Sequence, residues 1–254
     1  MDLQTYIQRK KTRNTEEESR WAALRTLCPR CLRPESACFC RIIQPFNTRT
    51  RFIFLMHPLE ARKEKNGTGR LAHLCLQNSE IRVGTDFSRD LTLEALIHSP
   101  DRVPLLLYPG PQSTPFPSFP WKEKLADEKT PCIFLPDGTW ALAKKIFARN
   151  PILQTLPRIA LNPSQSSQFF IKRQPRLDCL STIETVYQYL EECRRLGIET
   201  IQKEHALLLD VFRRMVNFQL ACAEDPNREG YRRDSCPRPR TTRIKHHSRS
   251  PIIF

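Results

Sequence analysis

The sequence predicts an α/β protein with a mainly parallel sheet and flanking helices. Four short apolar runs, each soon followed by Pro, Gly or Asn, alternate with segments of helical periodicity, which is the pattern of strands joined by crossover helices. The runs are continuously apolar, as expected of strands covered on both faces. The chain has 254 residues, 39% of them hydrophobic, and is long enough to bury one large core without disulfides.

The elements follow from these two patterns. The apolar runs place the expected strands at residues 52–56, 103–108, 132–135 and 158–161. Apolar positions three and four residues apart place the expected helices at residues 69–77, 140–149, 182–195 and 200–222. The Pro-rich segment 108–120 is expected to be too interrupted for regular structure.

The expected helix at 140–149 has two different faces. Its apolar residues recur at helical spacing on one face, whereas the other face carries Lys144, Lys145 and Arg149. We expect the apolar face to pack on the sheet. The basic face would meet solvent or phosphate.

The chain is strongly basic. Its 41 Lys and Arg against 27 Asp and Glu give a net charge of +14, which would attract a polyanion. Nucleic acid is the leading expected partner, although a basic surface that only aids solubility would carry the same charge. No apolar run approaches the ~20 residues that span a bilayer, and the first 20 residues lack the apolar core of a signal peptide. We therefore expect no membrane partner and a location inside the cell, in the cytoplasm.

Composition divides the chain into four parts. Residues 1–20 are polar and highly charged, and we expect an exposed arm. Residues 21–45 contain a cysteine-rich element, and residues 46–224 carry the α/β pattern. Residues 225–254 are basic and rich in Pro, so we expect a disordered tail that contacts RNA.

Four of the ten cysteines form a close cluster. They follow the pattern C-x2-C-x6-C-x-C, at Cys28, Cys31, Cys38 and Cys40. Thiolates at this spacing can complete a tetrahedral zinc shell, and four protein ligands leave no open position, so the expected zinc is structural. Reduced, unliganded thiols and an iron–sulfur cluster are the alternatives.

A charged, Gly-containing loop follows the first expected strand. It contains Arg62 and Lys63 and leads to Arg70. These cations could contact a phosphate or a carboxylate. A solvated loop is the alternative.

The sequence D-G-T-W at residues 137–140 joins an expected strand to an expected helix. Its residues would project from the carboxyl end of a strand, where open α/β sheets bind their ligands. In the structural alternative, Asp137 or Thr139 caps the helix and Trp140 packs. Spacing alone favours neither interpretation.

The sequence S-T-I-E at residues 181–184 matches a capping box. Ser181 would cap the helix, and Glu184 would return a hydrogen bond to the Ser181 amide. The exposed amides of this helix N-terminus could equally hold a ligand carboxylate.

These features jointly resemble a known family. The cysteine cluster, H-P-x-E with its downstream T-G-R-L, L-L-Y-P-G, D-G-T-W and S-T-I-E occur in that order. Together they resemble the DTW-domain family, which is named for the Asp, Thr and Trp of its D-x-T-W motif. The resemblance covers residues 28–195. The chain departs from the family pattern N-T-G-R-L at one place, where Gly67 separates Asn66 from Thr68.

Members of this family are tRNA-uridine aminocarboxypropyltransferases, which resemble the knotted SPOUT-type α/β RNA-modifying enzymes. The resemblance therefore implies a SPOUT-like fold with a knotted C-terminal half and a DTW catalytic domain at residues 46–224. It also implies transfer of the 3-amino-3-carboxypropyl group from S-adenosyl-L-methionine to N3 of a loop uridine in tRNA. Methylthioadenosine would be the second product.

The same resemblance implies roles for particular residues. The expected catalytic residues are Asp137, Thr139, Trp140 and Glu184, with Asp137 or Glu184 as the base that removes the uridine N3 proton. Trp140 would stack on the adenine or the target base, or pack against the sheet. The expected cofactor-binding residues are Leu135, Gly138, Pro109, Gly110, Ser181 and Thr182. The expected RNA contacts are Arg62, Lys63, Arg70, Lys144, Lys145 and Arg149.

Two other functions fit the same residues. A SPOUT-type RNA methyltransferase would share the cofactor and the substrate class and would differ in the carbon transferred. A non-catalytic RNA-binding protein would need only the zinc element and the basic surfaces. None of these functions requires a catalytic metal, and the sequence indicates no obligate protein partner.

Overall fold

The computed structural model describes most of the chain between residues 27 and 224. The described residues are 27–63, 66–163, 166–169, 171 and 179–224. They fall into two compact units, with the boundary between Arg41 and Ile42. The expected arm at 1–20 and the expected tail at 225–254 lie outside the described residues.

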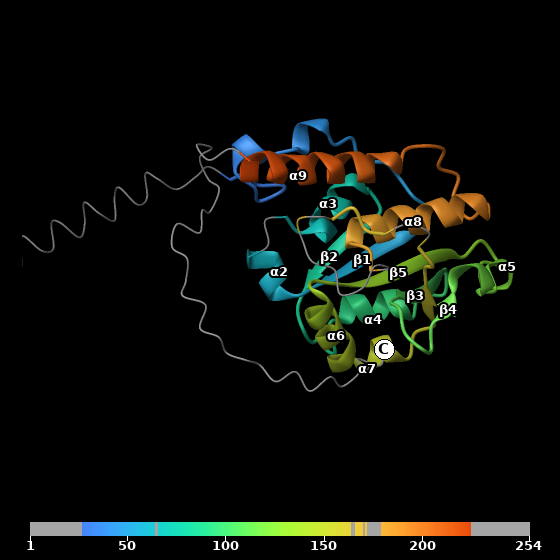
Figure 1. The fold of residues 1–254 in the computed structure, drawn as a ribbon. Coiled ribbons are helices and arrows are strands. Elements are labelled where there is room, and N and C mark those ends of the chain that lie inside the picture. Colours follow the sequence, from blue (N-terminus) through green and yellow to red (C-terminus); the bar gives the residue numbers. More distant parts are fainter. Residues whose placement is uncertain (1–26, 64–65, 164–165, 170, 172–178, 225–254) are drawn as a thin grey trace, which may run out of the picture. The chain divides into compact units, whose positions relative to one another are not determined.

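The second unit is built on a parallel sheet, which has six strands in the described residues (Figure 1). The strand order is β2-β1-β5-β3-β6-β4, and all neighbouring pairs are parallel. The prediction of a mainly parallel α/β fold is therefore confirmed. The strands span Arg51–Met56 (β1), Ser79–Val83 (β2), Arg102–Leu107 (β3), Thr114–Pro115 (β4), Thr130–Asp137 (β5) and Arg158–Ala160 (β6).

Helices cover both faces of the sheet (Figure 1). One face carries α3 (Thr68–Cys75), α8 (Thr182–Arg195) and α9 (Ala206–Glu224), and the other carries α4 (Leu91–Ile97), α6 (Trp140–Arg149) and α7 (Pro151–Gln154). The shorter helical turns are η1 (Glu35–Ala37), η2 (Cys40–Ile42), α2 (Pro58–Lys63), η3 (Phe116–Ser118) and α5 (Trp121–Lys124). The bounds expected for α6 and α8 are confirmed. Among the described helices, none is both long enough and apolar enough to cross a membrane.

The central strands are buried on both faces, which is why their sequences are continuously apolar. In β1, Phe52 and Phe54 point to one side and Ile53 and Leu55 to the other, and all four side chains are fully buried. The Phe52 ring meets Tyr189 of α8 edge to face, with the ring centroids 5.5 Å apart. Full burial of such a side chain stabilises the fold by about 1.5–3 kcal/mol.

The sequence pattern does not predict β2, because this edge strand is charged rather than apolar. Arg51 of β1 forms an ion pair with Glu80 at 3.0 Å, and Arg82 forms one with Asp90 at 2.8 Å. These side chains are only half-buried, so they keep contact with water while they hold the strand in place.

The expectation that residues 108–120 lack regular structure is wrong for two short elements, β4 and η3. Pro115 lies on the outermost strand of the sheet. A proline is tolerated there because its missing N–H removes no hydrogen bond from an inner ladder.

A buried carboxylate fixes the end of the sheet at which β1 begins. Glu199 follows α8 and is only 4% exposed. One of its oxygens accepts the backbone N–H of Arg49 at 2.8 Å, and the other accepts that of Thr50 at 2.7 Å. The side chain thus satisfies two backbone donors, of which that of Thr50 is buried, and joins the segment after α8 to the start of β1.

We expect Glu199→Gln to lower the free energy of unfolding by about 1–3 kcal/mol, because the new amide would turn an N–H toward a backbone N–H and leave that donor unsatisfied. Urea denaturation measures the difference from the wild type. Glu94→Gln, on the exposed side of α4, is the matched control and should change stability by less than about 0.5 kcal/mol. Equal stability of the two variants would show that the hydrogen bonds of Glu199 do not stabilise the fold.

Candidate functional site

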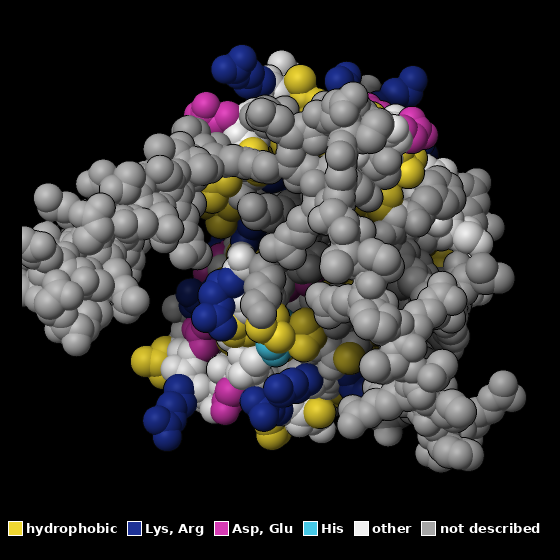
Figure 2. Space-filling model, turned by 60° about the vertical axis from the view of Figure 1, so that its left-hand side comes forward, with side chains coloured by type: hydrophobic (Ala, Val, Ile, Leu, Met, Phe, Trp, Pro, Cys, Tyr) yellow, Lys and Arg dark blue, Asp and Glu magenta, His cyan; other side chains and the backbone are white. Residues whose placement is uncertain are grey.

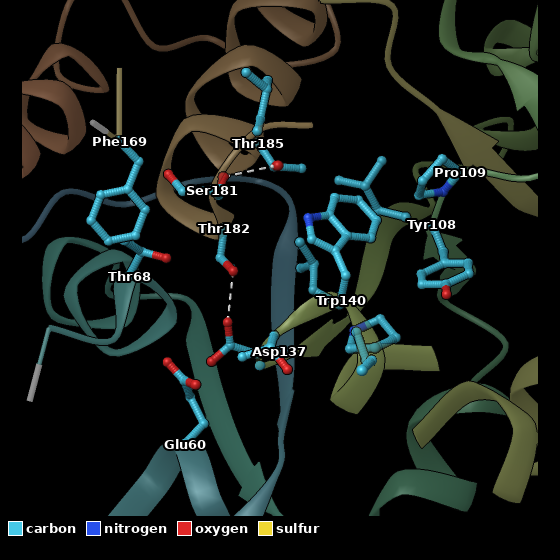
Figure 3. A pocket seen from close by; sticks show the side chains of 18 residues that line it. Glu60, Thr68, Tyr108, Pro109, Asp137, Trp140, Phe169, Ser181, Thr182 and Thr185 are labelled. Atoms are coloured by element: carbon cyan, nitrogen blue, oxygen red, sulfur yellow. Dashed lines mark hydrogen bonds between the residues drawn. The ribbon is translucent and has the colours of Figure 1, made fainter. Parts of the chain in front are cut away.

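A cavity of about 590 Å³ lies at the carboxyl ends of β3 and β5 (Figure 3). Three segments form most of its lining: the end of β3 and the residues after it (107–109), the end of β5 and the start of α6 (135–141 and 143), and the start of α8 (180–182 and 185). Glu60, Thr68 and Phe169 complete it. The carboxyl ends of parallel strands meet at one edge of the sheet, so the fold itself gathers these segments. A cavity of this size and position is typical of a small-molecule site.

Asp137 is the last residue of β5 and is only 2% exposed. Its Oδ1 accepts a hydrogen bond from the Thr182 hydroxyl at 2.6 Å. Its backbone oxygen accepts the N–H of His57 at 2.9 Å. The first bond joins the D-G-T-W and S-T-I-E segments, and the second joins the ends of β5 and β1. The Asp137 carboxylate is therefore held in a defined position in the cavity wall.

Gly69 allows the backbone of α3 to approach the Asp137 carboxylate. A Cβ atom at this position would lie 2.3 Å from Asp137 Oδ2 and 2.6 Å from Oδ1, closer than side chains tolerate. The T-G-R-L motif thus supplies a second surface against which Asp137 rests. The extra Gly67 lies at the N-cap of α3 with φ −60°, a conformation open to any residue.

The D-G-T-W corner does not act as a side-chain helix cap. Thr139 occupies the N-cap position of α6, but its side chain makes no capping hydrogen bond to that helix. Asp137 instead accepts the Thr182 hydroxyl. Gly138 has φ +153°, which other residues rarely adopt, and a Cβ there would lie 3.1 Å from the Leu142 side chain. Of the two interpretations left open by the sequence, this geometry favours a corner shaped for the cavity.

Trp140, at the start of α6, is half-buried and lines two adjoining cavities. The second cavity, of about 100 Å³, extends toward Ile159 and Asn162 after β6. Figure 3 shows the indole between Thr185 on α8 and Pro109 on the loop after β3. The ring is thus a wall of both cavities, and an aromatic ring in such a wall is a type of side chain on which bases stack.

Glu184 does not line the cavity, although the sequence places it among the candidate bases. The expected capping box is present, and the Ser181 N–H donates to Glu184 Oε2 at 2.8 Å. The same carboxylate accepts the Ser167 hydroxyl and the Gln168 N–H, each at 2.7 Å. These bonds occupy both oxygens and fix the segment that presents Phe169 to the cavity.

The expected cofactor residues mostly gather at the cavity. Leu135, Gly138, Pro109, Ser181 and Thr182 are part of its lining. Gly110 is not part of it. The N–H of Gly110 donates to the Ser113 hydroxyl at 3.2 Å, and this turn orients the loop that carries Pro109.

His57 and Glu60 connect β1 to the cavity, and Glu60 is absent from the site expected from the sequence. His57 is 5% exposed, and its Nδ1 accepts the N–H of Leu59 at 3.1 Å, which caps α2. Burial lowers the pKa of His57, and the charges of Lys145 and Arg149 lower it further, so the ring is neutral at pH 7. One turn later Glu60, 6% exposed, lines the cavity. The H-P-x-E spacing is the signal that could have identified it.

The expected RNA contacts lie on three helices, α2, α3 and α6. Arg62 on α2 and Lys144, Lys145 and Arg149 on α6 are exposed. Arg70 is half-buried and donates to the carbonyl of Ala61 at 2.8 Å, so it ties α3 to α2. The side chain of Lys63 lies outside the described residues. Figure 2, in which the side bearing α2 comes forward, shows Lys and Arg side chains on this face.

The first unit brings the four cysteines of the C-x2-C-x6-C-x-C pattern together. Their sulfur atoms all lie within 4.8 Å of one another. The Cys28–Cys40 and Cys31–Cys38 sulfur pairs are each 3.7 Å apart, close to the ~3.8 Å edge of a tetrahedron with Zn–S bonds of about 2.3 Å. Leu32, at φ 57°, closes the turn by donating to the Cys28 carbonyl at 2.8 Å. The cluster could therefore bind zinc.

The fold and the cavity define a class of protein. It is a parallel α/β protein with a cavity at the carboxyl ends of the strands and a separate four-cysteine element. The DTW domain family matches residues 25–220, and the chain belongs to this family.

Curated relatives share most of this region. Mouse (Mus musculus) tRNA-uridine aminocarboxypropyltransferase 2 is 29% identical over 206 residues, which cover 78% of this chain and 65% of the relative. The protein of the same name from Macaca fascicularis is 28% identical over 205 residues, which also cover 78% of this chain and 65% of the relative. That of Drosophila melanogaster is 32% identical over 65% of this chain and 66% of the relative. The chain thus spans about two thirds of the length of these relatives. No solved structure matches significantly.

The contact between Gly69 and Asp137 can be tested by a double-mutant cycle. We expect Gly69→Ala to lower the free energy of unfolding by about 1–3 kcal/mol, because its Cβ overlaps the Asp137 carboxylate. In an Asp137→Ala background the same change should cost less, because the overlapping atoms are gone. Thermal or urea unfolding of the four proteins gives the coupling. If the two effects add within about 0.5 kcal/mol, the contact does not constrain Asp137.

Proposed function

We propose that this protein is a tRNA-uridine aminocarboxypropyltransferase, which transfers a 3-amino-3-carboxypropyl group from S-adenosyl-L-methionine to N3 of a loop uridine. The observation that carries this conclusion is the cavity at the strand ends, where Asp137, Thr182 and Trp140 of the family motifs meet. Family membership and the names of the relatives support the same activity. An enzyme acting on tRNA would work inside the cell.

The cavity is suited to such a donor. S-adenosyl-L-methionine would supply a methylene carbon made electrophilic by the adjoining sulfonium. The residues proposed to hold it are Leu135, Gly138, Pro109, Ser181 and Thr182, with Gly110 fixing the loop conformation. Ser181 and Thr182, at the N-terminus of α8, line the cavity, and the backbone N–H of Thr182 is the donor proposed for a carboxylate, because the Ser181 N–H is bound to Glu184.

We assign the base to Asp137. The N3–H of uridine is a weak acid, so a positioned carboxylate must accept its proton as the new bond forms. Asp137 lines the cavity and is oriented by Thr182, whereas Glu184 holds the N-terminus of α8. Trp140 would offer its ring face to the adenine or the target base, and Thr139 would shape the corner beside it.

The basic face would bind the RNA backbone. Arg62, Lys144, Lys145 and Arg149 are exposed beside the cavity and can contact phosphates, while Arg70 holds α2 in place. N3 is on the pairing edge of uridine, so the target base must be unpaired to enter the cavity. Binding of this kind weakens as salt concentration rises.

We also propose a SPOUT-like knot in the C-terminal half of the catalytic domain, residues 46–224. The strand order supports it, because β5 inserts between β1 and β3 and the chain then adds β6 on the far side of β3. α8 then begins at the same cavity, whose lining also includes residues 107–109 and 135–141.

We expect Asp137→Asn to reduce aminocarboxypropyl-uridine formation at least about 100-fold, because the amide cannot accept the N3 proton. Mass analysis of nucleosides from tRNA treated with the purified protein and donor measures the product. Asp86→Asn, at an exposed loop carboxylate, is the control and should stay active.

Three results would contradict this proposal. A methyl-sized mass increment on uridine would identify a methyltransferase. Full activity of Asp137→Asn under multiple turnover would remove Asp137 from the chemistry, and no activity in the wild type with any tRNA would favour a non-catalytic RNA-binding protein.

We propose that the four cysteines hold a structural zinc ion. We expect about one zinc per chain by elemental analysis, and its loss in Cys31→Ser and Cys38→Ser, because a tetrahedral shell needs all four thiolates. Cys222→Ser, in α9, is the control and should retain the metal. Iron with acid-labile sulfide, or wild-type protein that stays metal-free after growth with added zinc, would overturn the assignment.

A further inference from the structure

The cavity contains a second buried carboxylate besides Asp137. Glu60 is 6% exposed and Asp137 is 2% exposed, and both belong to the lining. Figure 3 shows the two carboxylates pointing toward one another. Two buried carboxyl groups therefore lie at the same end of the cavity, although the chain as a whole carries a net charge of +14.

The fold places Glu60 at this point by a short and rigid route. Met56 pairs with Asp137 in the parallel register of β1 and β5. His57 follows, donates its N–H to the Asp137 carbonyl, and caps α2 through its ring nitrogen. Glu60 stands in the first turn of α2, where the helix macrodipole favours a negative charge.

A carboxylate in the wall of a partly enclosed cavity is a suitable partner for a cationic group of a ligand, because a charge-assisted hydrogen bond is strong there. The proposed donor carries such a cation, the ammonium group of its amino acid chain. We propose that Glu60 binds this ammonium group, which makes it a specificity-determining residue for the transferred chain. This inference rests on the function proposed above.

The opposite charge of the same chain finds its partner on α8. Thr182, the first residue of this helix, lines the cavity, and its backbone N–H is the donor proposed for the carboxylate, because the Ser181 N–H is bound to Glu184. With the ammonium on Glu60 and the carboxylate on α8, the chain is fixed at both charged groups. Its methylene carbon, rather than the methyl group, is then presented to the uridine.

The test compares two adenosyl ligands that differ in the amino acid chain. S-adenosylhomocysteine carries the ammonium and carboxylate groups, and methylthioadenosine carries neither. Titration calorimetry measures their affinities for the full-length protein and for Glu60→Gln. We expect Glu60→Gln to weaken S-adenosylhomocysteine about 10- to 100-fold, the loss of one charge-assisted hydrogen bond, and to change methylthioadenosine less than about 2-fold.

Two further variants complete the design. Glu60→Asp keeps the charge on a shorter side chain and should retain part of the preference for S-adenosylhomocysteine, which separates charge from packing. Glu123→Gln, at an exposed carboxylate of α5, should leave both affinities unchanged. Circular dichroism checks that each variant is folded. If Glu60→Gln does not fold, the ligand affinities of Glu60→Asp are compared with those of the wild type instead.

The outcomes separate this inference from the proposed function. If the wild type modifies tRNA and Glu60→Gln weakens both ligands equally, or neither, the role of Glu60 is overturned while the activity stands. If the wild type binds neither ligand and modifies no tRNA, the proposed function itself fails.

Discussion

The site depends on the fixed position of one carboxylate, that of Asp137. The Thr182 hydroxyl donates to it from α8, the backbone at Gly69 on α3 lies against it, and β1 holds the adjoining carbonyl through His57. Each contact comes from a different segment of the chain. A side chain held from three directions retains its orientation when a ligand enters, which is what a base needs in order to act without reorganisation.

This convergence explains why the motifs are far apart in the sequence. In a parallel sheet the segments that follow neighbouring strands meet at one edge, whatever their separation along the chain. β1 and β5 are adjacent in the sheet, so the H-P-x-E segment and the D-G-T-W segment become neighbours. The T-G-R-L and S-T-I-E segments join them because α3 and α8 pack together on one face.

The buried strands and long helices could be predicted because burial imposes a regular apolar pattern. That pattern predicted α6 and α8 to the residue and missed β2, an edge strand that pairs with β1 and carries ion pairs instead of a periodic apolar pattern. For the site, sequence spacing identified D-G-T-W as a corner but could not separate Asp137 from Glu184. Only three-dimensional contacts reveal that Glu184 accepts hydrogen bonds from residues 167, 168 and 181.

The two buried carboxyl groups at one end of the cavity contrast with the basic face beside it, and the proposed function gives these two regions different ligands. An RNA backbone would be bound by exposed cations spread over α2 and α6, where high dielectric and salt weaken each contact. A zwitterionic chain would be bound by a few polar and charged groups in a partly enclosed cavity, where each contact is stronger and more directional. The exposed cations would therefore supply the long-range attraction of RNA, whereas Glu60 would act at short range on the small ligand.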